Sequence, residues 1–337
     1  MRQIVFRRTG PPSVLELEEV PDLTPGPGEV RIAVEAAGVN FADLMARMGV
    51  YPDAPPLPSV VGYEVAGTVD AVGHGVDPGR VGEPVVALTR FGGYATQVVV
   101  AGFQAVRRPD GLGAVEGAGI PVVGLTAWML CEVMGRARAG DRVLVHSAAG
   151  GVGLAALDLL KWRGATAVGT ASAAKHERLL ARGYDQLVDY RTEDFEAVLA
   201  DGPGFDLVLD PVGGASWAKG LRLLRPGGRL GCFGFSAMAG SERRSLWSAV
   251  SAGFAVPWLQ VNPVSLMNAN KGVFGVNMGH LWDEGERVAG WLAELLVLWE
   301  QGVLRPHVHG TFPFDDVAGA HALLHGRGSF GKVVLVP

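Results

Sequence analysis

Residues 142–153 read Arg-Val-Leu-Val-His-Ser-Ala-Ala-Gly-Gly-Val-Gly, and this stretch decides how the middle of the chain folds. The apolar run Arg142–His146 predicts a buried strand, three glycines follow it, and Gly151–Trp162 has the pattern of a helix. Glycine lets the backbone turn tightly, approach a pyrophosphate and point the N–H groups of a helix N-terminus at it. The strand before and the helix after therefore predict a dinucleotide-binding loop rather than a tight turn without a ligand.

The loop departs from the usual glycine fingerprint at its first position, which is Ala148. The frame is thus alanine, glycine and glycine at the three spaced positions. The residues predicted to hold the pyrophosphate are Ala148, Gly150, Gly151, Val152 and Gly153.

Strands and helices alternate after the loop, which indicates βαβ units and a parallel sheet. The further strands expected are Thr166–Gly169, Leu187–Asp189, Phe205–Leu209 and Arg229–Gly234. The first 120 residues are instead rich in short β-runs between Gly/Pro turns. The tail is mixed, with helices expected over Glu284–Glu300 and Val317–Leu324 and a strand over Lys332–Val336.

The composition narrows the possible classes. Of the 337 residues 48% are apolar and 19% charged, which excludes a disordered chain and suits two domains. A net charge of −5 without a long basic run disfavours nucleic acid as a partner. Two cysteines, Cys131 and Cys232, form neither a disulfide framework nor an all-cysteine zinc site, and we interpret both as packing residues.

The stretch after the expected second strand bears on the choice of nicotinamide cofactor. NAD-binding proteins place Asp or Glu there to hold the ribose hydroxyls, whereas residues 168–176 contain no carboxylate. Ser172 can donate a hydrogen bond to a 2′-phosphate and Lys175 can pair with it, although a solvated lysine is the plain alternative. The missing acid favours NADPH.

With these residues in view, the chain resembles the zinc-free quinone oxidoreductase branch of the medium-chain dehydrogenase/reductase superfamily. Within it, the resemblance is nearest to the vesicle amine transport protein (synaptic vesicle membrane protein) subgroup. The segments that carry it are Gly-Val-Asn-Phe-Ala-Asp (38–43), Arg-Met-Gly-Val-Tyr (47–51), Gly-Tyr-Glu-Val-Ala-Gly (62–67), and residues 145–153, 169–176, 210–214 and 331–337.

The resemblance implies an α/β fold made of a GroES-like β-rich catalytic domain and a Rossmann domain with a doubly wound parallel sheet. The catalytic domain is expected to be discontinuous, over 1–121 and 284–337. The NADP-binding domain is expected over 122–283, with an apolar insertion near 240–270. Further cofactor-lining positions implied by similar enzymes are Thr126, Tyr190, Phe233, Phe235, Val276 and Lys332.

The same resemblance argues against a metal. Zinc-dependent relatives carry Cys where this chain has Asn40 and His where it has Tyr63, and Asn and neutral Tyr are poor zinc ligands. Hydride transfer to a simple ketone then lacks its strongest electrophilic aid, whereas in an enone or quinone the charge moves to an oxygen that a few donors can stabilise.

Tyr51 and Asn40 are the expected catalytic donors, by resemblance near the nicotinamide. Tyr51 could also relay the proton that quenches the enolate, or only pack in a proline-rich loop. Asn40 could instead fix the ribose or orient its loop, and Asp43 is expected to cap a helix start.

Residues 245–267 carry no formal charge, but two prolines and two polar amides argue against a membrane span. Trp247, Phe254 and Trp258 in it could roof an apolar substrate, form a dimer contact or pack in a core. The first ten residues lack the apolar segment of a signal peptide, so a cytoplasmic protein is expected. We also expect it to form a homodimer.

We therefore expect an NADPH-dependent reductase of an apolar conjugated carbonyl or quinone. Two alternatives remain open at this point. One is a biosynthetic reductive cyclase, in which the enolate closes a ring. The other is a non-catalytic NADPH-binding or lipid- or membrane-interaction protein.

Overall fold

The computed structural model describes residues 1–236 and 259–337 and divides into two compact units. Unit 1 comprises Met1–Leu125 and Met278–Pro337, and unit 2 comprises Thr126–Asn277. Both chain ends thus build unit 1, and unit 2 is inserted between them in the sequence. The domain ends expected from the sequence, after residues 121 and 283, lie a few residues from these.

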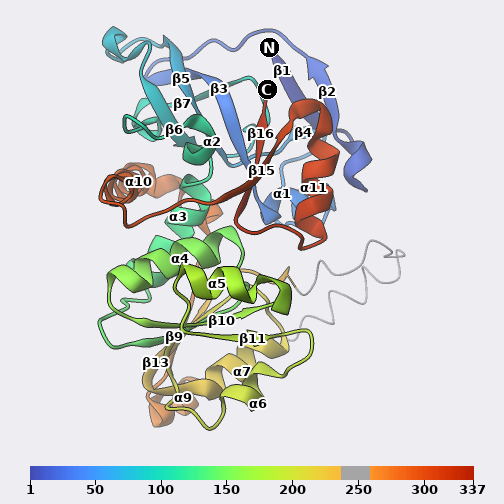
Figure 1. Cartoon of the computed structure of the whole chain (residues 1–337). Helices are drawn as coiled ribbons and strands as arrows, with labels where there is room; N and C mark the ends of the chain where they lie inside the picture. Colours follow the sequence, from blue (N-terminus) through green and yellow to red (C-terminus); the bar gives the residue numbers. More distant parts are fainter. Residues whose placement is uncertain (237–258) are drawn as a thin grey trace. The chain divides into compact units, whose positions relative to one another are not determined.

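Unit 2 is built on a six-stranded parallel sheet, and the predicted α/β class is confirmed (Figure 1). Helices α4 and α5 cover one face, and α6 and α7 cover the other. The strand order is β11 (Gln186–Asp189), β10 (Thr166–Ala171), β9 (Arg142–Val145), β12 (Phe205–Asp210), β13 (Leu224–Cys232) and β14 (Gly272–Gly275). The helices are α4 (Gly151–Trp162), α5 (His176–Arg182), α6 (Phe195–Leu199) and α7 (Ala215–Leu223).

Two strands of this sheet differ from the sequence prediction. The strand expected over Arg229–Gly234 begins earlier, at Leu224, because the Pro-Gly-Gly stretch 226–228 that reads as a turn lies inside β13, beside a register shift against β12. Strand β14 was not predicted. It has only four residues and pairs in parallel with β13 at the edge of the sheet.

Unit 1 contains a larger, mostly antiparallel sheet and a small three-stranded one. The larger order is β15 (Val308–Pro313), β16 (Lys332–Val336), β3 (Glu29–Val39), β5 (Glu64–Val72), β6 (Pro84–Leu88) and β8 (Val106–Arg107), with β7 (Gln97–Ala101) also pairing with β3. The smaller order is β2 (Glu16–Glu19), β1 (Arg2–Phe6) and β4 (Ser59–Val60). A buried core of mainly Val and Ala includes residues of both sheets.

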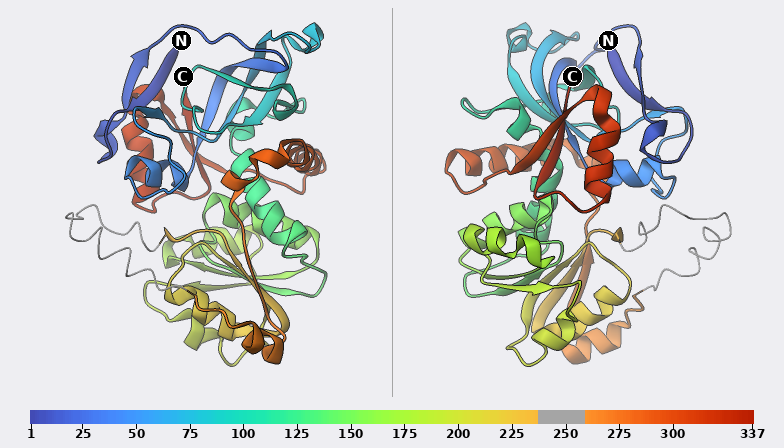
Figure 2. Two further views of the ribbon diagram at one scale, coloured as in Figure 1. Left: turned by 180° about the vertical axis from the view of Figure 1, so that it is seen from behind. Right: turned by 45° about the vertical axis from the view of Figure 1, so that its right-hand side comes forward.

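The C-terminal strand β16 is what joins the two ends of the chain in unit 1. It pairs antiparallel with β3, with Val333 opposite Val39 and Leu335 opposite Ala37. Helix α11 (Val317–His325) packs on β15 and β16 (Figure 2). Other helices are α1 (Phe41–Arg47), α2 (Ala114–Gly117), α3 (Pro121–Trp128), which crosses the unit boundary, and α10 (Gly285–Glu300).

The apolar segment expected near 240–270 is described only in its second part. Helix α9 (Pro263–Ala269) exposes Val264 by 60% and Met267 by 73%, so these two side chains are not core residues. Trp247, Phe254 and Trp258 lie outside the described residues. Within the described part of the chain, no helix has the length and apolar character needed to cross a membrane.

Candidate functional site

The glycine loop lies between β9 and α4 in unit 2, where the predicted strand and helix are both present. Gly153 has no room for a side chain, because a Cβ there would lie 2.7 Å from the carbonyl oxygens of Ser147 and Ala148. Gly150 precedes the helix with an extended backbone. The first N–H groups of α4 have no intrahelical partner and carry partial positive charge, so the loop fits a phosphate anion.

Ala148 packs the loop against strand β10. It is fully buried, and its N–H donates to the carbonyl oxygen of Thr170 at 3.1 Å. A Cβ at Gly169 would lie 2.8 Å from the Ala148 methyl group, so the loop sits tightly on β10. The alanine in place of the first glycine therefore fits this packing.

A cluster of cationic side chains follows β10 and β11. Burial lowers the pKa of Lys175, and the charges of Arg191 and Arg178 lower it further, whereas Tyr190 raises it. Ser172, 7% exposed, accepts the N–H of Lys175 at 2.9 Å through its backbone. A phosphate bound here would relieve the repulsion between the cations.

Arg178 and Arg191 were not predicted as site residues. The parallel pairing of β10 with β11, with Ala171 opposite Asp189, brings the turn after β11 beside the one after β10. The one sequence feature that could have indicated Arg191 is its place directly after the expected strand Leu187–Asp189.

Three of the predicted cofactor-lining residues gather at the carboxyl ends of β12, β13 and β14. The Phe233 N–H donates to the Asp210 carbonyl at 3.1 Å, and the Val276 N–H donates to the Cys232 carbonyl at 2.9 Å. A Cβ at Gly213 would lie 3.1 Å from the Phe235 backbone. Thr126, in the same unit, is 9% exposed on α3.

His146 occupies the same edge of the sheet and is buried. Its Nδ1 lies 3.0 Å from the Thr170 hydroxyl, and its Nε2 lies 4.0 Å from Asp210 Oδ2. Burial lowers the pKa of His146, which keeps the imidazole neutral. These contacts indicate a structural role for His146.

In unit 1, Asn40 belongs to a buried polar triad. The Lys332 ammonium donates to Glu64 Oε1 at 2.5 Å, to Asn40 Oδ1 at 2.8 Å and to the Val39 carbonyl at 2.9 Å. Asn40 Nδ2 also donates to Glu64 Oε1 at 2.8 Å, and the Val122 N–H donates to Glu64 Oε2 at 2.7 Å. Both ends of the Asn40 amide are thus engaged, and Lys332, expected to line the cofactor, holds Asn40 and Glu64.

Asp43 caps α1, as expected, and also ties two loops together. Its Oδ2 accepts the Asn40 N–H at 2.8 Å, and its Oδ1 accepts the Gly62 N–H at 2.9 Å. The Tyr94 hydroxyl donates to Oδ2 at 3.2 Å and lies 3.2 Å from His321 Nε2. Burial raises the pKa of Asp43 to about 7. Asp43 therefore fixes the backbone at Asn40 and at Gly62, which lie before and after Tyr51 in the sequence.

Tyr51 lies beside a second tyrosine. Its ring meets that of Tyr63 edge-on, with the centroids 6.3 Å apart, and Tyr63 in turn lies 4.7 Å from the Phe91 ring. Tyr51 is partly exposed, whereas Tyr63 is buried. Burial raises the pKa of both phenols. Tyr51 thus carries a neutral hydroxyl group, and its ring packs against the Tyr63 ring.

Asn40 and Tyr63, which stand where the resemblance implies the zinc ligands of metal-dependent relatives, are poor ligands for a divalent cation. Asn40 contacts the Lys332 ammonium, which already supplies a positive charge to Glu64, and Tyr63 offers a neutral phenol. Within residues 1–236 and 259–337, no three His, Cys, Asp or Glu side chains cluster as metal ligands would.

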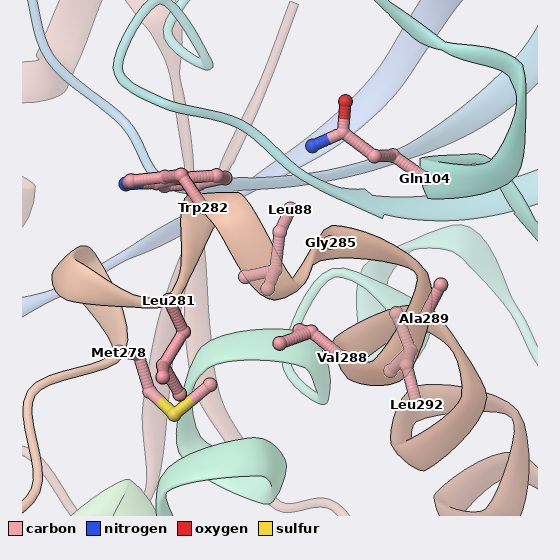
Figure 3. Close-up of a pocket in the computed structure, with 9 residues that line it drawn as sticks. All are labelled: Leu88, Gln104, Met278, Leu281, Trp282, Gly285, Val288, Ala289 and Leu292. Atoms are coloured by element: carbon pink, nitrogen blue, oxygen red, sulfur yellow. The ribbon is translucent and has the colours of Figure 1, made fainter.

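Unit 1 also has a small, partly open pocket of about 20 Å³, shown in Figure 3. Apolar side chains of α10 and the residues before it form most of its wall. Its lining residues are Leu88, Gln104, Met278, Leu281, Trp282, Gly285, Val288, Ala289 and Leu292. None of the predicted site residues is among them.

Comparison with known proteins gives matches over the whole chain. Residues 26–117 match the family model described as alcohol dehydrogenase GroES-like domain, and residues 182–335 match the one described as zinc-binding dehydrogenase. The human synaptic vesicle membrane protein VAT-1 homolog is 40% identical over 318 residues, covering 93% of this chain and 80% of the relative. The Streptomyces venezuelae pikromycin polyketide synthase component PikAII is 37% identical over 315 residues, covering 92% of this chain and 8% of the relative.

Solved structures show the same likeness. The Escherichia coli quinone oxidoreductase complexed with NADPH superposes with a TM-score of 0.87 at 29% identity, covering 100% of both chains. A mycobacterial protein complexed with NADPH gives 0.86 at 32% identity, also covering 100% of both. The CurK enoyl reductase gives 0.83 at 27% identity, covering 99% of this chain and 98% of that one.

Proposed function

Because the chain belongs to the medium-chain dehydrogenase/reductase superfamily, together with VAT-1 homologues and quinone oxidoreductases, we propose that it is an NADPH-dependent, zinc-independent reductase of an α,β-unsaturated carbonyl or a quinone. The observation that carries the zinc-independent part is the buried triad of Lys332, Asn40 and Glu64. An ammonium group there satisfies the polar groups that a metal would otherwise approach.

The residues of unit 2 fit NADPH. Gly150–Gly153 and the N-terminus of α4 would hold the pyrophosphate, and Lys175, with Arg178 and Arg191 beside it, would hold the 2′-phosphate. The Asp189 carboxylate lies in the same turn, but it accepts the backbone N–H of Arg191 at 3.0 Å. When bound, NADPH would supply a hydride to the acceptor.

The other predicted cofactor contacts stay proposals of the same kind. Phe233, Phe235 and Val276 would border the nicotinamide side at the carboxyl ends of the strands, and Thr126 and Tyr190 would lie along the cofactor. For Lys332 we propose a different role from the expected one, which is to hold the Asn40 amide and the Glu64 carboxylate in place.

The chemistry follows from the donors present. A conjugated acceptor that receives hydride at its β-carbon places negative charge on its oxygen, where a hydroxyl group can stabilise it. Tyr51 is neutral, partly exposed and backed by aromatic rings, so we assign it as the donor to this oxygen and as the source of the proton. Asn40, with its amide engaged, orients the start of α1 beside it.

Label transfer tests this function. The purified protein is given NADPH deuterated at the transferring position, together with a panel of enones and quinones. With an enone, the label is expected on the carbon β to the carbonyl. Label on a carbinol carbon would show that the enzyme reduces simple carbonyls and that the proposal is wrong.

The same products decide between simple reduction and ring closure, because a cyclised product has a new carbon–carbon bond in its NMR spectrum. The described residues favour neither the reductive cyclase nor the non-catalytic NADPH-binding protein. The homodimer remains a prediction, which light scattering of the purified protein tests.

A further inference from the structure

Tyr63 has no role in the proposed chemistry, although its surroundings fix it firmly. Its carbonyl oxygen accepts the Thr89 N–H at 2.8 Å. The residues on either side are also held, since the Gly62 N–H donates to Asp43 and the Glu64 carboxylate binds Lys332. The Tyr63 side chain is therefore presented from a backbone that has little freedom to move.

The hydroxyl group of Tyr63, like that of Ser216, stands out among the buried hydroxyl groups of the described residues. It is buried, and it makes no hydrogen bond of normal distance and angle with any residue in the described part of the chain. Buried hydroxyl groups are nearly always paired, because burial without a partner loses the hydrogen bonds made to water. The Tyr94 hydroxyl, buried in the same unit, is paired with Asp43 and His321. The buried Tyr63 hydroxyl is therefore a candidate for a functional role.

Tyr51 is the polar neighbour that faces it. The two rings meet edge-on at 6.3 Å, with an interplanar angle of 82°. Burial is the main cause that raises the pKa of each phenol, and beyond burial the two hydroxyl groups act on each other. Tyr63 lowers the pKa of Tyr51, and Tyr51 raises that of Tyr63. These are the directions expected when Tyr63 donates and Tyr51 accepts.

We propose that Tyr63 is a positioning residue whose hydroxyl group donates to the Tyr51 oxygen once Tyr51 has given its proton to the substrate. This inference rests on the proposed function. The Tyr51 O–H bond breaks as the proton passes to the enolate oxygen to which it donates, and water later returns a proton to the Tyr51 oxygen. A donor at 63 stabilises the phenolate in between and makes Tyr51 a better acid.

The charges around Tyr51 show why such a donor is needed. Asp53 and Asp43 both raise the pKa of Tyr51, so each opposes a phenolate. The Asp53 carboxylate lies 2.9 Å from His280 Nε2, which offsets its charge only when that imidazole is protonated. Among the described neighbours that act on Tyr51, Tyr63 is the one that favours the phenolate.

A fluorine probe tests the contact without cofactor or substrate. 3,5-Difluorotyrosine placed at position 51 ionises at a lower pH than tyrosine and gives a fluorine NMR signal of its own. Tyr63→Phe is expected to raise the titration midpoint of this signal by about one pH unit, because the phenolate loses a hydrogen bond. Tyr184→Phe, which removes a buried hydroxyl of unit 2 that donates to the Gly153 carbonyl, is expected to leave the midpoint in place. An unchanged midpoint in Tyr63→Phe would overturn the proposal.

Two further readouts separate a positioning role from a structural one. Tyr63→Phe is expected to unfold at the same temperature as the wild type or higher, since the lost hydroxyl was unpaired, whereas Tyr94→Phe unfolds at a lower temperature. In NADPH-dependent turnover, Tyr63→Phe is expected to lower kcat about tenfold or more with the affinity for NADPH unchanged.

The outcomes for this inference and for the proposed function differ. A shifted midpoint with unchanged kcat would overturn the positioning role of Tyr63. A wild-type protein that reduces none of the acceptors would refute the proposed function, while the fluorine titration would still decide whether Tyr63 donates to Tyr51.

Discussion

Replacing Lys332 with Met tests whether the buried triad of unit 1 depends on this ammonium group. Methionine keeps the apolar stem and roughly the volume of lysine, but it removes the three hydrogen bonds to Val39, Asn40 and Glu64. The side chains of Lys332 and Glu64 are 5% and 0% exposed, so the variant leaves a carboxylate buried without its counter-charge. Breaking such a buried pair on one side typically costs about 3–5 kcal/mol.

The assay is the thermal unfolding of the purified chain by calorimetry. A loss of about 3–5 kcal/mol corresponds to a fall of about 6–20 °C in the midpoint for a unit of this size. The double variant Lys332→Met with Glu64→Gln is expected to recover more than half of this loss. Its glutamine keeps an oxygen for the Val122 N–H and removes the buried charge.

A matched substitution provides the control. Lys161 pairs with Asp185 at 2.6 Å, but these side chains are 31% and 45% exposed, so Lys161→Met is expected to cost less than about 1 kcal/mol. If Lys332→Met were no more destabilising than Lys161→Met, the argument that an ammonium group holds the triad in place of a metal would be refuted.

Three further predictions concern the cofactor, the metal and the pH dependence. Lys175→Ala and Arg191→Ala are each expected to weaken NADPH binding about tenfold in calorimetric titration, with NADH binding unchanged, because each loses a charge-assisted contact to the 2′-phosphate; equal losses for both cofactors would contradict this. Turnover is expected to survive dialysis against a chelator, and zinc that is both stoichiometric and needed for activity would disprove zinc independence. His321→Gln is expected to change how the free energy of unfolding depends on pH in the acid range. Burial lowers the pKa of His321 to about 3, so the imidazole of the unfolded chain takes up a proton first, and the wild type loses stability as the pH falls below about 6.5, by up to about 1.4 kcal/mol per pH unit. Denaturant titrations of the variant over this range should lack the slope.

The sequence alone was enough to predict the features that depend on neighbouring residues. The glycines after an apolar run, the helix over Gly151–Trp162 and the alternation of strands with helices are local patterns, and the structure contains them. The same holds for Asp43 as a helix cap, since a capping residue acts within three positions of itself. Short-range patterns also have limits, because the Pro-Gly-Gly stretch inside β13 has the composition of a turn, and the four residues of β14 are too few to show a period.

Only the tertiary structure decided which distant side chains act together. Asn40, Glu64 and Lys332 are separated by up to 292 positions, and they meet because β16 pairs with β3, whose neighbour on the other side is β5. Arg191 reaches the surroundings of Lys175 because β11 pairs in parallel with β10. Which strands pair across a long stretch of sequence is decided by the packing of the whole sheet, so a local pattern does not reveal it. For the same reason the sequence could not show that the Tyr63 hydroxyl has no hydrogen-bond partner among residues 1–236 and 259–337, since tertiary packing decides which groups meet.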